Sequence, residues 1–156
     1  GDIEVIVHPQ SVIHSMVQFR DGSIKAQLGL PDMRLPIIYA LGFPERVPTD
    51  FPRFSFTNYP SLTFESPDVK NFRNLALAFD AVHRGGNMPC VLNAANEIVV
   101  HAFLEKRIGF TAMPDIIEEV LQHSGFIAGP SLEDFINTNT ETRIKTELLV
   151  KSWETD

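Results

Sequence analysis

Hydrophobic and polar positions follow three different patterns along the chain. In residues 1–42, short apolar runs rich in β-branched residues flank the dipeptide Asp21-Gly22. Asp-Gly between two apolar runs is typical of a β-hairpin, because both residues tolerate a positive φ. We therefore expect strands within Val12–Phe19 and Ile24–Leu30, and a short helix over residues 32–41.

Residues 43–68 combine closely spaced prolines with aromatic side chains. Proline fixes φ and lacks a backbone N–H, so this spacing excludes a long helix. Disordered linkers are poor in aromatic residues, so we expect an extended connector that lies on an apolar surface. The prolines are Pro44, Pro48, Pro52, Pro60 and Pro67, and the aromatic residues are Phe43, Phe51, Phe54, Phe56, Tyr59 and Phe64.

Apolar residues recur every three or four positions through residues 69–156, which predicts helices. The first helix ends at Gly85-Gly86, the second begins near Pro89, the third is capped by Thr111, and the last covers about Thr140–Trp153. Helices joined by short connections are typical of a small bundle. The expected buried faces are Phe72, Leu75, Phe79 and Val82; Val91, Leu92, Ala95, Ile98, Val99, Ala102 and Phe103; Ile116, Ile117, Val120 and Leu121; and Ile144, Leu148 and Val150.

These patterns together predict an α+β chain in three parts. Residues 1–42 form a β-hairpin, or the remnant of a sheet, with a helix. Residues 43–68 form the extended proline-rich linker, and residues 69–156 form a four-helix bundle-like domain. A chain of roughly 150 residues buries about 70% of its extended surface, which is enough for a true core.

Charge and cysteine content narrow the class of partner and the compartment. The formal net charge of −7 argues against a nucleic-acid surface, which needs clustered Lys and Arg. No apolar run approaches the roughly 18 residues of a membrane span. Cys90 is the single cysteine, so no intrachain disulfide can form. With no visible secretory signal, we expect a reducing, cytoplasmic compartment.

Two histidines and the cysteine are the first residues that could carry chemistry. His8 and His14 match no metal-binding spacing, so we expect packing or polar contacts for both. His14 is the stronger site candidate, because strand alternation groups it with polar side chains. Cys90 lies beside a predicted helix start and has no catalytic partner near it in the sequence, so we expect a small buried residue and not a nucleophile. The residues alone therefore give no complete catalytic set.

Asn93, Asn96 and Glu97 share one face of a predicted helix. They form either a polar site or a structural junction that clamps the helix to a neighbouring loop. We favour the junction, because Asn inside a helix usually has a specific partner. The pair Gly85-Gly86 follows a helix and does not lead into one, so it is not a phosphate-binding loop.

The stretch Ile3–Val17, which contains His-Pro-Gln-Ser-Val-Ile-His-Ser, closely resembles a signature of the 1-deoxy-D-xylulose 5-phosphate reductoisomerase family. Three further blocks follow in that family's order. They are Asp21–Ser23 with Ala26–Gly29, then Pro31–Ile37, then Leu92–Ile98. The blocks and their spacing together are highly specific.

The resemblance implies an enzyme of three parts: an NADPH-binding domain, a catalytic domain with Mg²⁺ or Mn²⁺, and a C-terminal helical domain after an extended linker. The family converts 1-deoxy-D-xylulose 5-phosphate to 2-C-methyl-D-erythritol 4-phosphate, on the non-mevalonate route to isoprenoids. Residues 1–42 would then end the catalytic domain. The similarity covers residues 3 to about 123 and is weaker after Gly129. The family's metal-binding carboxylates and cofactor loop lie upstream of the matched region, so the resemblance implies that this chain alone is inactive and binds neither NADPH nor metal.

The resemblance also implies roles for a few residues. Ser11 and His14 match positions that border the substrate pocket, and Pro31 and Met33 match a segment near the nicotinamide; for Met33 the alternative is core packing. The family's twofold sheet contact implies a homodimer through the strand Ile24–Leu28. It also implies a bacterial cytoplasm or a plastid. The competing hypothesis is a self-standing helical interaction or dimerisation module without catalysis.

Overall fold

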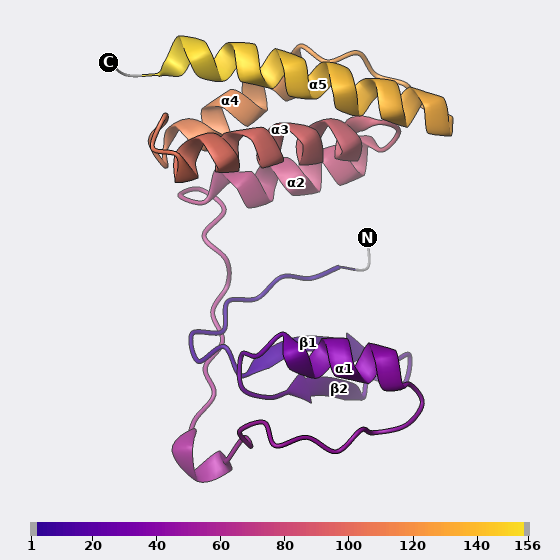
Figure 1. Ribbon diagram of the computed structural model, residues 1–156, viewed down its shortest axis with the longest axis vertical. Coiled ribbons are helices and arrows are strands. Elements are labelled where there is room, and N and C mark those ends of the chain that lie inside the picture. The colour runs from indigo at the N-terminus through magenta and orange to yellow at the C-terminus, as the bar shows by residue number, and fades with distance from the viewer. Residues whose placement is uncertain (1–2, 155–156) are drawn as a thin grey trace. The chain divides into compact units, whose positions relative to one another are not determined.

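The computed structural model describes residues 3–154, which divide into two compact units, and the boundary in the chain falls between Pro67 and Asp68. The first unit holds the strands β1 and β2, the helix α1 and a short 3-10 helix, Phe56–Asn58. The second unit holds α2 to α5 (Figure 1). The predicted α+β class is therefore confirmed. Among the described residues, no helix is both long and apolar enough to span a membrane.

The hairpin consists of β1 (Ile13–Gln18) and β2 (Ile24–Leu28), which pair antiparallel. Gly22 adopts a φ of 84°, a conformation that glycine reaches without steric cost. The Asp21 carboxylate accepts hydrogen bonds from the Ser23 backbone N–H, at 2.9 Å, and from its hydroxyl, at 2.6 Å. The Asp-Gly signal thus marks the hairpin correctly, and the aspartate contributes through its side chain.

Helix α1 (Arg34–Gly42) begins two residues after Asp32, whose carboxylate binds the first residue of the helix. Oδ1 of Asp32 accepts a hydrogen bond from the Arg34 backbone N–H at 2.9 Å. Its Oδ2 receives Nη2 of the Arg34 guanidinium at 2.6 Å. These bonds hold the pKa of Asp32 below its ordinary value. Pro36 lies in the first turn, where its missing N–H costs no helical hydrogen bond.

The proline-rich stretch that follows α1 lies against the first unit through cation–π contacts. The guanidinium carbon of Arg34 lies 4.3 Å from the ring centroid of Phe51. That of Arg46 lies 3.8 Å from the ring of Tyr39, on α1. Such contacts favour a fixed path over a free linker. The division of the chain into three parts stays a prediction.

In the second unit, α3 (Met88–Leu104) lies between α2 (Arg73–Arg84) and α5 (Leu132–Trp153) (Figure 1). Helix α4 (Ala112–Gln122) packs against all three of these helices. The predicted faces of α3 and α4 are confirmed, and they supply most of the core. The core residues are Ala81, Met88, Val91, Ala95, Val99, Ala102, Ile108, Met113, Ile116, Ile117, Val120, Leu121 and Val150.

The predicted buried face of α2 is right only in part: Leu75 and Phe79 are half-buried, but the prediction is wrong at its two ends. Phe72, which precedes the helix, and Val82 are each 61% exposed. Ala81 is fully buried instead, and Leu77 packs against the core beside it. A small alanine lets α2 approach its neighbours closely, which the periodicity of larger apolar residues did not reveal.

Helix α5 is longer than expected and begins at Leu132, two turns before Thr140. Ser131 and Asp134 form a reciprocal capping box: the serine hydroxyl accepts from the Asp134 N–H at 3.2 Å, and the carboxylate accepts from the Ser131 N–H at 2.9 Å. Such a box satisfies two backbone donors that a helix start leaves free. It fixes the start of α5 upstream of the apolar positions.

The buried face of α5 also differs from the prediction. Ile144 and Leu148 are 58% and 62% exposed, whereas Val150 is buried as expected. The rest of the buried face is formed by Thr138, Thr142 and Thr146. Threonine suits this face because its hydroxyl can bond within its own helix, as the Thr146 hydroxyl does to the Thr142 carbonyl at 2.7 Å. Its methyl group is then free to pack against α3.

Candidate functional site

Ser11 occupies an uncommon backbone conformation. A turn runs from His8, whose carbonyl accepts the Ser11 N–H at 3.0 Å, through Pro9 and Gln10. Proline favours the second position of such a turn because its φ is preset. Ser11 ends the turn with a φ of 51°, in the left-handed region that L-residues seldom adopt. Outliers of this kind cluster at functional sites, and this one lies on a residue that we expected to border a pocket.

His14 lies at a second irregularity, three residues further on. Ile13 pairs with Leu28 and Ser15 pairs with Gln27, so His14 is the additional residue of a β-bulge. A bulge interrupts the strand's alternation and gives one side chain a new direction. Bulges are over-represented beside active sites, so the position supports a site at the start of β1.

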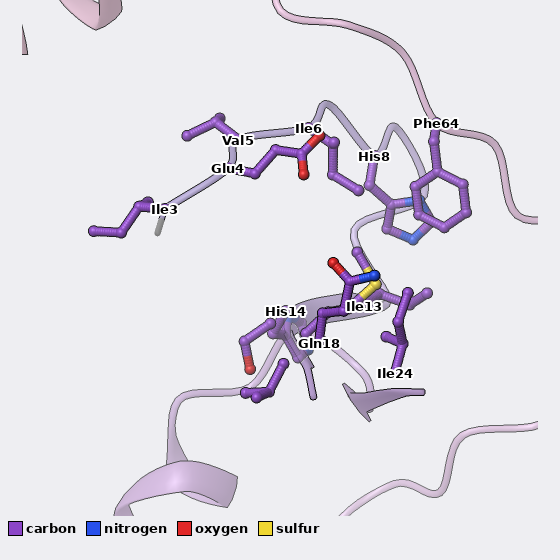
Figure 2. A pocket seen from close by; sticks show the side chains of 13 residues that line it. Ile3, Glu4, Val5, Ile6, His8, Ile13, His14, Gln18, Ile24 and Phe64 are labelled. Atoms are coloured by element: carbon purple, nitrogen blue, oxygen red, sulfur yellow. The ribbon is translucent and has the colours of Figure 1, made fainter. Parts of the chain in front are cut away.

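An open cleft of about 910 Å³ lies between the segment that precedes the turn and β1 (Figure 2). His14 lines this cleft, together with His8, Glu4 and Gln18 among apolar side chains. Ser11 is not among the lining residues and is exposed. The structure therefore places His14 in a cavity large enough for a small metabolite, with Ser11 at the adjoining turn.

Pro31 and Met33 form an exposed step between β2 and α1. Met33 directly precedes α1 and is 73% exposed, so the alternative of core packing is wrong for it within this chain. A thioether can pack adaptably on a flat ring, which fits contact with a nicotinamide. Asp32 between them is held by Arg34, which fixes the backbone of the step.

The described residues do not fit a metal site. Between residues 3 and 154, no three His, Cys, Asp or Glu side chains come together in a way that could hold an ion. For NADPH, the exposed step at Met33 offers an apolar contact for a ring. The phosphates need backbone N–H groups at a helix start or a glycine-rich loop. The pair Gly85-Gly86 ends α2 and lies just before α3, which begins at Met88, so the expectation that it does not lead into a helix is wrong. It still differs from a glycine-rich cofactor loop, because it follows a helix and not a strand.

Asn93, Asn96 and Glu97 lie on α3, where Glu97 meets two donors. The Asn93 amide donates to Oε1 of Glu97 at 2.9 Å, and the Arg143 guanidinium from α5 donates to Oε2. Both lower the pKa of Glu97, with the arginine as the larger cause. The group therefore meets helix α5, where a loop was expected as the partner. Nothing in the local sequence singled out Arg143.

Cys90 has the environment of a structural thiol. It is half-buried on α3, and its Sγ donates to the Phe135 carbonyl at 3.6 Å. Burial raises the pKa of the Cys90 thiol, which opposes formation of a reactive thiolate.

Comparison with known proteins identifies the family. The model of the DXP reductoisomerase C-terminal domain matches residues 28–145. The 1-deoxy-D-xylulose 5-phosphate reductoisomerase of Bacteroides thetaiotaomicron is 58% identical over 150 residues, which are 96% of this chain and 38% of that protein. The enzyme of Chloroherpeton thalassium is 49% identical over 141 residues, 90% of this chain and 36% of its own length.

Solved structures agree with these relatives. The Zymomonas mobilis reductoisomerase in complex with NADPH has a TM-score of 0.84 and 48% identity, over 96% of this chain and 39% of that one. A DOX-P reductoisomerase in complex with NADPH, fosmidomycin and magnesium has a TM-score of 0.84 and 34% identity, over 94% and 38%. The chain thus spans less than two-fifths of the relatives' length, and the similarity continues past Gly129, where a weaker match was expected. With the family model matching most of its residues, the chain belongs to the DXP reductoisomerase C-terminal domain family.

Proposed function

We propose that this chain is the C-terminal portion of an NADPH- and divalent-metal-dependent reductoisomerase that converts 1-deoxy-D-xylulose 5-phosphate to 2-C-methyl-D-erythritol 4-phosphate. The observation that carries the proposal is 58% identity to a named reductoisomerase along 96% of the chain. Both units lie inside that similarity. A self-standing helical module would need only the second unit, so the similarity of the first favours the enzyme.

In this proposal the chain contributes to binding, and upstream residues contribute the metal ligands and the cofactor's phosphate site. The cofactor supplies hydride for the reduction. His14, directed by its bulge, borders the substrate, and Ser11 presents its hydroxyl at the adjoining turn. The exposed Met33, beside Pro31, lies against the nicotinamide and shields that end of the cofactor from water. No step is assigned to a metal on this chain.

A chimera tests the proposal directly. The part of the Bacteroides thetaiotaomicron enzyme that precedes its matching region is joined to this chain, and NADPH oxidation is followed with substrate and Mg²⁺. We expect turnover by the chimera and none by this chain alone or by the upstream part alone. A folded chimera without turnover, beside an active parent enzyme, would refute the proposed function. Turnover by this chain alone would refute its dependence on the upstream part.

Two substitutions in the chimera separate the proposed contacts. Met33→Ala should raise KM for NADPH several-fold and leave KM for the sugar phosphate within about twofold. His14→Ala should do the opposite. Equal effects of both substitutions on both constants would contradict these assignments.

The proposal extends to the oligomer, a homodimer formed through β2. Among the described residues β2 pairs with β1 alone, and an uncovered strand edge is prone to pair with a second chain. The Phe19 N–H donates to the Ser23 carbonyl at 2.8 Å, so this pair is hydrogen-bonded. Antiparallel ladders alternate, so the N–H of Ala26 faces the outer edge.

Light scattering on the purified chain tests the dimer. We expect a dimer for the unchanged chain and weaker association for Ala26→Pro, which removes one outer donor and spares the ladder to β1. Ala26→Thr keeps the donor and is the matched control. A monomer at high micromolar concentration would refute the dimer, and an Ala26→Pro dimer of unchanged affinity would move the interface away from β2.

We also propose a reducing compartment, a bacterial cytoplasm or a plastid, which the single Cys90 supports.

A further inference from the structure

The turn that ends at Ser11 is attached to a distant part of the first unit. Just before the turn, Val7 and Glu65 exchange two backbone hydrogen bonds, each 2.9 Å long. This isolated bridge brings residues 63–65, at the end of the proline-rich stretch, alongside the segment that leads into the turn. A single bridge of this kind sets the two segments side by side, and side chains then fix them.

Two side chains, those of His8 and Gln10, hold Thr63 and its neighbour Phe64. The Gln10 amide lies against Thr63: its Oε1 accepts the Thr63 N–H at 3.1 Å, and its Nε2 donates to the Thr63 hydroxyl at 2.8 Å. Nδ1 of His8 donates to the Thr63 carbonyl at 2.9 Å. The His8 ring stacks on Phe64 with centroids 5.0 Å apart (Figure 2). We name these four residues the clasp.

The clasp lies directly beside the strained residue. Gln10 directly precedes Ser11, which is exposed and whose backbone has a positive φ. On the other side, Val12 is fully buried and its carbonyl accepts the Gly29 N–H at 2.9 Å. An uncommon backbone conformation persists where its surroundings over-determine it. Here the clasp and Val12 do so from the two sides of Ser11.

We propose that Gln10 and Thr63 are positioning residues, which hold Ser11 in its left-handed conformation and so aim its hydroxyl at the substrate. The inference rests on the proposed function for its link to substrate. It gives the end of the proline-rich stretch a role in the site, although residues 10 and 63 are 53 positions apart in sequence. Neither residue touches substrate in this proposal, and each acts through Ser11.

Nuclear magnetic resonance on the whole chain tests the conformational part without any assay of activity. A positive φ at Ser11 gives a strong intraresidue N–H to Hα Overhauser effect. We expect Gln10→Ala to weaken it, while Gln10→Glu keeps it, because a carboxylate can accept from both the Thr63 N–H and hydroxyl. Gln27→Ala is the matched control, because among the residues that the structure describes the Gln27 amide donates only to the adjacent Leu28 carbonyl. An unchanged Ser11 signal in folded Gln10→Ala overturns the proposal.

Kinetics of the chimera test the functional part. Gln10→Ala should raise KM for the sugar phosphate about tenfold with kcat little changed, and Gln10→Glu should restore most of it. In a Ser11→Ala background, Gln10→Ala should change KM by less than about twofold, because its effect passes through the Ser11 hydroxyl. Equal effects in both backgrounds would show that Gln10 acts on stability alone, and would overturn the proposal. An inactive chimera without these substitutions would refute the proposed function and the link to substrate. The resonance experiment would still decide whether the clasp holds the left-handed backbone conformation of Ser11.

Discussion

Replacing Asn87 with Ala should destabilise the helical unit more than an alanine substitution at an exposed residue of α3. Asn87 is 2% exposed and directly precedes α3. Its side chain does not cap that helix and instead bridges to the loop after α4. Nδ2 donates to the Gly125 carbonyl and Oδ1 accepts the Ile127 N–H, both at 2.9 Å. A longer contact of 3.4 Å reaches the hydroxyl of Thr138 on α5.

The magnitude follows from these contacts. Each well-formed hydrogen bond contributes about 1 kcal/mol net, so two of them account for roughly 2 kcal/mol. Gly125 and Ile127 are exposed, so water can replace the lost partner and the full cost of an orphaned group does not apply. The space left by the amide adds up to about 1 kcal/mol. Asn87→Ala should therefore lose about 2–3 kcal/mol, which for a unit of this size lowers Tm by roughly 10–20 °C.

Helical circular dichroism during thermal and urea unfolding of the whole chain measures this loss. Asn93→Ala is the matched control, because Asn93 is exposed and bonds only to Glu97 within the described residues, and it should change stability by less than about 0.5 kcal/mol. Amide exchange should speed up at Ile127 in the first variant and not in the second. A loss for Asn87→Ala no larger than that of the control would refute the assignment of the bridge.

Three further predictions concern the same unit. Gly86→Ala should lower the free energy of unfolding by about 2–4 kcal/mol in a urea titration, because the φ of Gly86 is 56° and an added Cβ would lie 2.2 Å from the Ile127 carbonyl oxygen. Gly109→Ala should be near neutral in the same titration, because a Cβ added at Gly109 would meet nothing within 4 Å. Thr146→Val should change stability by less than about 1 kcal/mol, whereas Thr146→Leu should lose about 1–3 kcal/mol by overpacking a fully buried position, as measured by chemical unfolding. The capping hydrogen bonds from Ser131 hold the pKa of Asp134 below its ordinary value of 3.8 in the folded state. The stability that ionised Asp134 contributes is therefore present above pH 3.8 and is lost as the pH falls through the lower pKa of the folded state. Asp134→Asn should reduce the acid-induced fall in Tm, and an equal fall in both proteins would contradict this.

Local signals in the sequence were sufficient where one short segment decides the structure. The dipeptide Asp21-Gly22 marks the hairpin, because its backbone and side chain both favour a tight turn. Gly85-Gly86 marks the end of α2, and both glycines adopt a positive φ there. The faces of α3 and α4 were predicted correctly because their apolar residues are numerous and recur at helical spacing.

The candidate site could be predicted in part. His14 and Met33 were found by resemblance to a family, and the structure places one in a cleft and the other on an exposed step. The bulge at His14 was not predicted, since it depends on the register between two strands. The pairing of Gln10 with Thr63 also left no local trace, because an isolated glutamine and threonine are ordinary surface residues.

The sequence by itself therefore determined the order of the elements, the position of the hairpin and the family. Tertiary structure alone decided which faces are buried when the periodic signal is weak. On α5 the threonines face the core while Ile144 and Leu148 face outward, because the small residues of α3 suit a compact side chain that satisfies its own hydroxyl. It also decided the conformation of Ser11, which is held by contacts from a segment far away in the chain. Local propensity encodes an element, but the energy of burial and of long-range hydrogen bonds exists only once the chain has folded.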